Sequence, residues 1–139
     1  MAEQFTIQKM IQARPEQVFQ IWLDSRLHTT ITGGNYQIEP VTGGKFTAWD
    51  GYICGTLIDI EPSRRISMRW RASEFPQDAP DSPLELTFED KGNETLVTLN
   101  HSTIPEGLGE SHRQGWFNFY LDPLVKYYSK TNKTGKNNE

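Results

Sequence analysis

Residues 84–101 have the sequence LELTFEDKGNETLVTLNH, and this stretch decides how the chain folds. Apolar and polar residues alternate on both sides of a short turn over residues 91–93. Alternation with a period of two is typical of a strand that has one face in a core. The stretch therefore predicts two antiparallel strands, with Val97, Leu99 and His101 on one face of the second strand.

The residues before this stretch repeat the strand pattern. Strands are predicted at about 36–38, 45–49, 52–60 and 66–70. Asp50-Gly51 marks a hairpin turn, because glycine accepts the positive φ that such turns require. Three prolines in residues 75–83 predict a loop. At the start of the chain we expect a first strand over about 4–12, followed by two short helices that begin at Pro15 and end before Gly33.

A long helix is predicted from about Glu110 to Ser129. Its large apolar side chains recur at helical spacing, so they are expected to form one broad face turned inward. They are Trp116, Phe119, Tyr120, Leu124 and Tyr127. Pro123 lies inside this pattern and is expected to kink or locally open the helix, because proline lacks a backbone donor. Residues 131–139 contain no apolar residue and are predicted to form a disordered polar tail.

The predicted order of elements is a strand, two short helices, about six antiparallel strands and a long helix. A single helix packed over a curved antiparallel sheet is an α+β architecture. A chain of 139 residues with 35% hydrophobic and 23% charged residues has the size and composition of one globular domain. We therefore expect a single domain over residues 1–130.

The charge balance argues against several classes of function. Fourteen basic and eighteen acidic residues give a net charge of −4, so the chain lacks the basic surface that nucleic acids or anionic membranes would attract. No apolar run approaches the roughly 20 residues of a membrane span. The first residues lack the pattern of a secretory signal. Cys54 is the only cysteine and cannot form an internal disulfide, so a cytoplasmic location is the simplest expectation.

A series of short motifs carries a resemblance to a known family. In chain order they are Ala13-x-Pro15-x-x-Val18-Phe19-x-x-Trp22, Gly43-Gly44-x-Phe46, Asp50-Gly51-x-x-x-Gly55, Ile60-Glu61-Pro62, Trp70-Arg71, Val97-x-Leu99-x-His101-Ser102-x-Ile104-Pro105 and His112-x-x-Gly115-Trp116. The first motif resembles the N-terminal strand–helix junction of the START-like superfamily, also called SRPBCC or birch-pollen-allergen-like. Together the motifs resemble the activator of heat-shock protein 90 ATPase homologue family, over roughly residues 5–129.

The resemblance implies a helix-grip fold, in which a curved antiparallel sheet of about six to seven strands wraps around a long C-terminal helix. The family includes a co-chaperone domain and many single-domain bacterial proteins, and the wider superfamily includes lipid carriers and aromatic cyclases. The eukaryotic co-chaperone has a separate N-terminal domain, whereas the fold here is expected to begin at residue 5. We therefore expect the single-domain bacterial type, without strong stimulation of a heat-shock ATPase.

A sheet that curls around one helix leaves space beneath it, and we expect this space to form an internal ligand cavity. The predicted lining comprises Phe46, Met68, Trp70, Phe88, Leu99, His101, Trp116, Phe119 and Tyr120. His101 has two interpretations: a core-edge residue that hydrogen-bonds the C-terminal helix, or a polar group that orients a ligand or acts as an acid or base. His112 is expected on the solvated surface of that helix.

The function that these observations favour is non-catalytic binding of a small hydrophobic or aromatic ligand. One alternative is a protein-interaction module that regulates the heat-shock protein 90 ATPase as a co-chaperone. A second alternative is a cyclase-like enzyme using the same cavity, with His101 and Tyr120 as its candidate polar groups. No metal or cofactor is predicted, because no motif has the spacing of metal ligands.

Overall fold

A computed structural model describes the backbone of residues 2–137 and the side chains as far as Ser129. The elements in chain order are β1 (Glu3–Ile11), α1 (Pro15–Ile21), α2 (Ser25–Thr32), β2 (Tyr36–Ile38), β3 (Lys45–Ala48), β4 (Ile53–Glu61), β5 (Arg65–Ala72), β6 (Ser82–Asp90), β7 (Thr95–Ile104), α3 (Gly109–Trp116), the π-helical turn η1 (Phe117–Leu121) and α4 (Asp122–Asn137).

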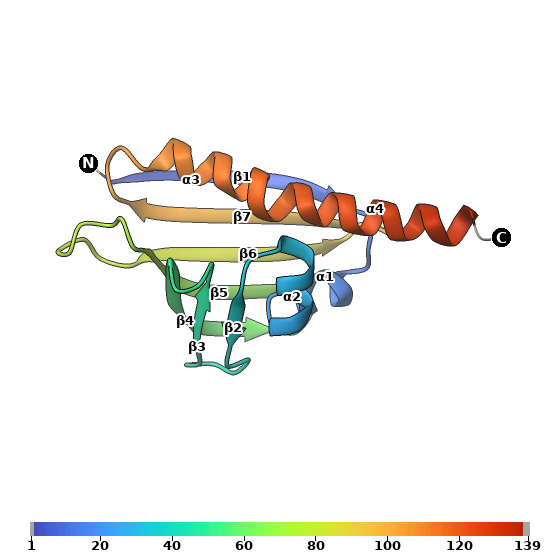
Figure 1. The fold of residues 1–139 in the computed structure, drawn as a ribbon, viewed down its shortest axis with the longest axis horizontal. Coiled ribbons are helices and arrows are strands. Elements are labelled where there is room, and N and C mark those ends of the chain that lie inside the picture. Colours follow the sequence, from blue (N-terminus) through green and yellow to red (C-terminus); the bar gives the residue numbers. More distant parts are fainter. Residues whose placement is uncertain (1, 138–139) are drawn as a thin grey trace.

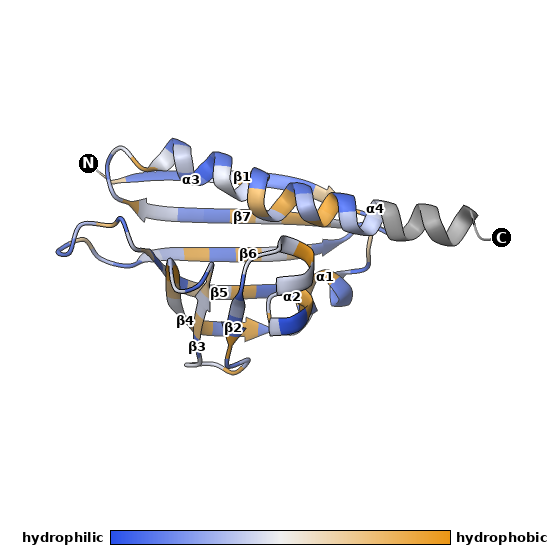
Figure 2. Cartoon of the chain, viewed as in Figure 1, coloured by the Kyte–Doolittle hydropathy of each residue, from blue (hydrophilic) through white to orange (hydrophobic). Residues whose placement is uncertain are grey.

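The strands form one antiparallel sheet of seven strands in the order β1-β7-β6-β5-β4-β3-β2. In the β6–β7 pair, Leu86 lies opposite Leu99 and Phe88 opposite Val97, and all four side chains are buried. Hydrophobic and hydrophilic residues alternate along the strands (Figure 2). The alternation seen in residues 84–101 therefore sets both the pairing register and the face that packs against the helices.

The two short helices connect β1 to β2 and pack against β6, β2 and α4. Pro15 begins α1, where its missing N–H has no helical partner to lose. The Asp24 side chain accepts a hydrogen bond from the Leu27 N–H at 2.9 Å and so caps α2. Gly33, with φ of 83°, ends α2 in the left-handed conformation. These signals were readable in the sequence, and both predicted helices are confirmed.

The C-terminal helices α3 and α4, joined by η1, form one nearly continuous rod that runs along β1 and β7 (Figure 1). The wide turn η1 ends immediately before Asp122-Pro123. A regular α-helix through Pro123 would press its ring against the carbonyl group of Phe119. The wider π turn relieves this clash, so the predicted local opening at Pro123 is confirmed. With the curved sheet, this rod confirms the helix-grip fold and the α+β class.

Phe119 departs from the predicted inward face of this rod. Trp116, Tyr120 and Leu124 are buried, whereas Phe119 is 54% exposed. A π turn contains more residues than an α turn, so it rotates the positions within and after it about the helix axis. Tyr128 is consequently buried, while Tyr127 is only half-buried. The predicted inward position of Phe119 is wrong, because it assumed uninterrupted α-helical periodicity.

The predicted polar tail, 131–139, begins inside α4, whose backbone is helical as far as Asn137. Residues 138–139 lie outside the described part of the chain, and the domain boundary at residue 130 stays a prediction. Within residues 2–137, no helix is both long enough and apolar enough to cross a membrane.

Candidate functional site

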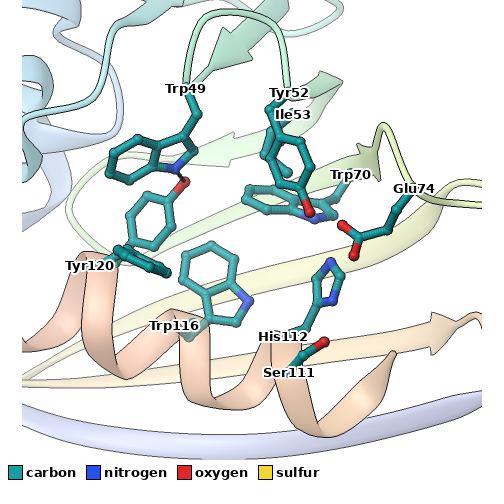
Figure 3. A pocket seen from close by; sticks show the side chains of 11 residues that line it. Trp49, Tyr52, Ile53, Trp70, Glu74, Ser111, His112, Trp116 and Tyr120 are labelled. Carbon is teal, nitrogen blue, oxygen red and sulfur yellow. Dashed lines mark hydrogen bonds between the residues drawn. The ribbon is translucent and has the colours of Figure 1, made fainter. Parts of the chain in front are cut away.

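A pocket opens where the tip of the β3–β4 hairpin, the segment after β5 and the helix α3 meet (Figure 3). Its volume is about 170 Å³. Most of the side chains that line it are aromatic, and a few polar ones lie among them. The lining consists of Trp49, Tyr52, Ile53, Trp70, Glu74, Ser111, His112, Gly115, Trp116, Phe119 and Tyr120.

The inner wall of the pocket is a packed series of aromatic rings. The ring centroids of Trp70 and Trp116 are 4.9 Å apart, and those of Trp116 and Tyr120 are 4.4 Å apart. Phe119 and Trp49 meet edge to face at 5.6 Å. The first three side chains are buried and Phe119 is exposed, so the wall runs from the core to the surface. Such a wall provides apolar aromatic surface for a ligand from the buried end of the pocket to its rim.

Trp49 is held over the pocket by an unusual backbone and a close neighbour. It begins a hairpin tip in which Trp49, Asp50 and Gly51 all have positive φ, at 55°, 58° and 91°. Its indole N–H donates to the Tyr120 hydroxyl at 2.8 Å. A Cβ atom on Gly34 would overlap the Trp49 ring, so the glycine makes room for it. Bulky residues rarely adopt positive φ, and strain of this kind clusters at ligand sites.

The polar side of the pocket carries His112, Glu74, Ser111 and Tyr52 (Figure 3). The Nδ1 atom of His112 lies 3.0 Å from the Leu108 carbonyl oxygen. Because a carbonyl only accepts, Nδ1 carries the proton, and Nε2 is the acceptor in the neutral ring. His112 is half-buried and its ring contacts those of Phe75 and His101. It is therefore part of the pocket wall, and its predicted place on the solvated surface is wrong.

His101 lies fully buried behind the aromatic wall. The indole N–H of Trp116 donates to its Nδ1 at 3.0 Å, which confirms the predicted bond to the C-terminal helix. Burial, helped by the nearby His112, lowers the pKa of His101 to about 3, so the ring is neutral near pH 7. Its proton then lies on Nε2, which has no hydrogen-bond partner among the described residues. We call Trp70, His101 and Trp116 the open cluster.

A second buried histidine, His28, also contacts Tyr120, at a ring distance of 5.6 Å. It stacks on Tyr36 with centroids 3.7 Å apart and meets Trp22 edge to face. The Tyr36 hydroxyl donates to the Trp22 carbonyl at 2.8 Å. Burial lowers the pKa of His28 to about 4, although a hydrogen bond to the Ile21 backbone opposes this shift. We call Trp22, His28 and Tyr36 the sealed cluster, because all three are buried and none lines the pocket.

The structure divides the predicted cavity lining into two groups. Trp70, Trp116, Phe119 and Tyr120 line the pocket. The other five are buried in the core away from it: Phe46, Met68, Phe88, Leu99 and His101. Contacts between rings, such as Phe46 with Trp70, extend through the space where the cavity was expected. The opening is therefore at the side of the fold, between the hairpin tip and α3.

Sequence reasoning missed Trp49, Tyr52 and Glu74, which all lie on connecting segments. One signal was available for the first two, since they flank the Asp50-Gly51 turn that the sequence does predict. A hairpin tip at the edge of a curved sheet brings its flanking side chains over the neighbouring helix. No comparable signal exists for Glu74, which follows the end of β5.

The two polar groups considered for catalysis lie in separate hydrogen bonds. His101 and Tyr120, the pair considered for catalysis, are bound to different partners, Trp116 and Trp49. Burial raises the pKa of Tyr120, so its hydroxyl is neutral. Within residues 2–137, no group of three or more His, Cys, Asp or Glu residues is placed to hold a metal ion.

Comparison with known proteins identifies the family of this chain. The family model described as "Activator of Hsp90 ATPase homolog 1-like protein" matches residues 12–129. The chain belongs to this family. The mouse and human proteins named "Activator of 90 kDa heat shock protein ATPase homolog 1" are each 29% identical to it over 123 residues. The match covers 88% of this chain but 36% of each relative, so the chain spans about a third of their length.

Solved structures support the fold assignment. An HSP90 activator from Plasmodium falciparum superposes with a TM-score of 0.79 at 21% identity, covering 89% of this chain and 94% of that one. CalU16 from Micromonospora echinospora gives 0.77 at 25% identity, covering 91% and 74%. The Aha1 dimer from Colwellia psychrerythraea gives 0.73 at 17% identity, covering 91% and 96%. These three structures therefore share the fold described above.

Proposed function

We propose that this family member binds a small planar, mainly apolar molecule in the pocket beside Trp49, Trp70 and Trp116. The observation that carries the proposal is an aromatic wall that continues from the buried core to an exposed rim. Binding sites for small molecules are concave and mostly apolar, with a few polar groups that fix orientation. The pocket has this composition, with Glu74, Ser111 and His112 on its polar side.

The size of the pocket limits the ligand to one or two rings. Pockets for drug-sized ligands occupy roughly 300–1,000 Å³. An engineered apolar cavity of about 150 Å³ in another protein binds benzene. The pocket here, at about 170 Å³, belongs with the smaller case. A fatty acyl chain or a large polycyclic compound would exceed this volume and extend past the rim into solvent.

Intrinsic fluorescence tests this proposal, because Trp49, Trp70 and Trp116 line the pocket while Trp22 does not. Toluene and naphthalene should change the emission saturably, with dissociation constants between about 1 µM and 1 mM, or about −8 to −4 kcal/mol. Phe119→Ala should weaken binding about fivefold or more, because it removes an exposed part of the wall. Val41→Ala is the matched control, since Val41 is also exposed but lies outside the pocket. If neither probe binds, the proposed binding of a purely apolar ring in this pocket is contradicted.

A second candidate function is regulation of an Hsp90-type chaperone, which the names of the relatives favour. Phe119 and Tyr52 are large side chains exposed at the rim of the pocket, at 54% and 43%, and aromatic side chains of this kind are common at protein interfaces. The test is the steady-state ATPase rate of the cognate chaperone with the full chain added at equal concentration. A several-fold stimulation would place this role ahead of ligand binding. An unchanged rate, with no complex detectable by calorimetry, would remove it.

A further inference from the structure

The indole N–H of Trp70 is an unsatisfied donor in the wall of the pocket. Trp70 is 5% exposed, and its Nε1 atom has no hydrogen-bond partner among the described residues. The other two indoles of the wall are satisfied, since Trp49 donates to Tyr120 and Trp116 donates to His101. A buried donor without an acceptor is costly, so an acceptor from outside the chain that displaces the side chains covering this atom would be bound favourably.

Acceptors lie on the same side of the pocket. Figure 3 shows the indole nitrogen at the edge of Trp70 that faces Tyr52 and Glu74, and the Glu74 carboxylate directed toward the pocket. An ionised carboxylate only accepts hydrogen bonds. Among the lining residues, none is a lysine or an arginine. The polar side of the pocket therefore combines the unpartnered donor of Trp70 with the exposed Glu74 carboxylate, and Tyr52 and His112 lie beside them.

This combination selects among the polar groups that a small aromatic ligand could carry. A carboxylate on the ligand would be repelled by Glu74, and an ammonium group could not accept from Trp70. An ether oxygen would accept from Trp70 but could not donate to Glu74, whose exposed carboxylate would keep its water. A hydroxyl group accepts and donates through one oxygen atom, so it suits both residues.

We propose that the ligand is a small hydroxylated aromatic compound of the phenol class. Its oxygen accepts from Trp70 Nε1, its O–H donates to the Glu74 carboxylate, and its ring packs against Trp116 and Phe119. This inference rests on the proposed function, because it names the ligand class of the same pocket.

The test compares four probes of similar size on the full chain: phenol, anisole, toluene and benzylammonium. Phenol should bind at least tenfold more tightly than toluene or anisole, a difference of about 1.4 kcal/mol, and more tightly than benzylammonium. Equal affinity for phenol and toluene, or tighter binding of anisole or benzylammonium, would overturn the hydroxyl assignment and leave the apolar pocket standing. Failure of all four probes would remove the proposed function as well.

Two further measurements locate the hydroxyl group. In the wild-type chain, the Trp70 indole N–H resonance, assigned through bonds, should shift on addition of phenol and stay in place with toluene. Glu74→Ala should weaken phenol binding about fivefold while leaving toluene binding unchanged. Asp78→Ala is the matched control, because Asp78 is exposed on the same segment and outside the pocket. An unmoved Trp70 resonance, or equal losses in the two variants, would overturn the assignment.

Discussion

The open cluster and the sealed cluster are built from the same kinds of side chain and differ in what covers them. Each combines a fully buried, neutral histidine with large aromatic rings, and the two flank Tyr120. In the sealed cluster, the helix α2 carries His28 and the strand β2 carries Tyr36, and the two rings stack. In the open cluster, the cover is a hairpin tip and a connecting segment, and a pocket remains beside Trp70 and Trp116.

The comparison shows that composition does not decide where a cavity forms in this fold. A regular element packs its side chains at fixed spacing and fills the space below it. A four-residue hairpin tip, Trp49–Tyr52, spans the gap with two large side chains and leaves room between them. The positive φ of Trp49 lies on the open side, and backbone strain of this kind is often found at functional sites.

The largest expected effect comes from removing a ring that belongs both to the pocket wall and to the core. Trp116→Ala should reduce the free energy of unfolding by about 3–5 kcal/mol, because it empties a fully buried site. It also leaves His101 Nδ1 without its donor. Urea denaturation followed by circular dichroism measures the loss. Phe119→Ala, on the same helical rod but exposed, should change stability by less than about 1 kcal/mol. Similar losses in both variants would show that the wall is not part of the core.

Lowering the pH should destabilise both clusters, because each contains a buried neutral histidine. The pKa values of His28 and His101 are lowered from 6.5 to about 4 and about 3. Below about pH 6.5, the unfolded chain therefore binds protons that the folded chain does not bind. The free energy of unfolding is highest above about pH 6.5 and falls as the pH drops toward the two lowered pKa values. At pH 5 the loss should be about 2 kcal/mol for each histidine, at about 1.4 kcal/mol per pH unit.

The control for this titration is His28→Phe, which removes one of the two buried histidines. The slope of unfolding free energy against pH between 6 and 5 should fall to about half. A slope that is unchanged in the variant would assign the pH dependence to other groups. A wild-type slope near zero would show that both rings are accessible to protons in the folded chain.

The strands could be predicted from the sequence because each has one buried face. The alternation of Leu84, Leu86 and Phe88 against Val97 and Leu99 fixes the register, since a slip of one residue would turn every apolar side chain outward. The helix signals at Pro15 and Gly33 act over a few residues and were equally readable. Phe119 could not be placed, because its direction depends on a π turn that sequence periodicity does not reveal.

The site was predictable only where helices and strands build it. Trp116 and Tyr120 repeat at helical spacing, and Trp70 alternates in a strand, so the inward position of all three could be predicted. Trp49 and Glu74 lie on connecting segments, whose paths depend on tertiary contacts such as the Trp49–Tyr120 hydrogen bond. Periodic sequence patterns predict the pocket walls that helices and strands build, but they do not predict the walls that loops build.

The next largest effect should come from Gly34→Ala, which tests how Trp49 is positioned. The added Cβ would overlap the Trp49 ring, so the indole must move and its hydrogen bond to Tyr120 should break. Overpacking of this kind costs about 1–3 kcal/mol. Gly115→Ala is the control, since its Cβ would meet Phe119 at an ordinary 3.7 Å. Thermal unfolding and the indole N–H resonances report both effects. Equal stability of the two variants would show that Trp49 is not held in place by Gly34.

The smallest expected effect belongs to the sealed cluster. Tyr36→Phe removes the buried hydroxyl that donates to the Trp22 carbonyl while keeping the ring that stacks on His28. The loss should be about 1 kcal/mol, the net value of one hydrogen bond. Because this cluster has no part in the pocket, probe binding should be unchanged. Tyr52→Phe is the control, and it should leave stability intact because Tyr52 is 43% exposed at the pocket rim. A change in probe affinity for Tyr36→Phe would show that the two clusters are coupled through Tyr120, and the separation between open and sealed regions would no longer hold.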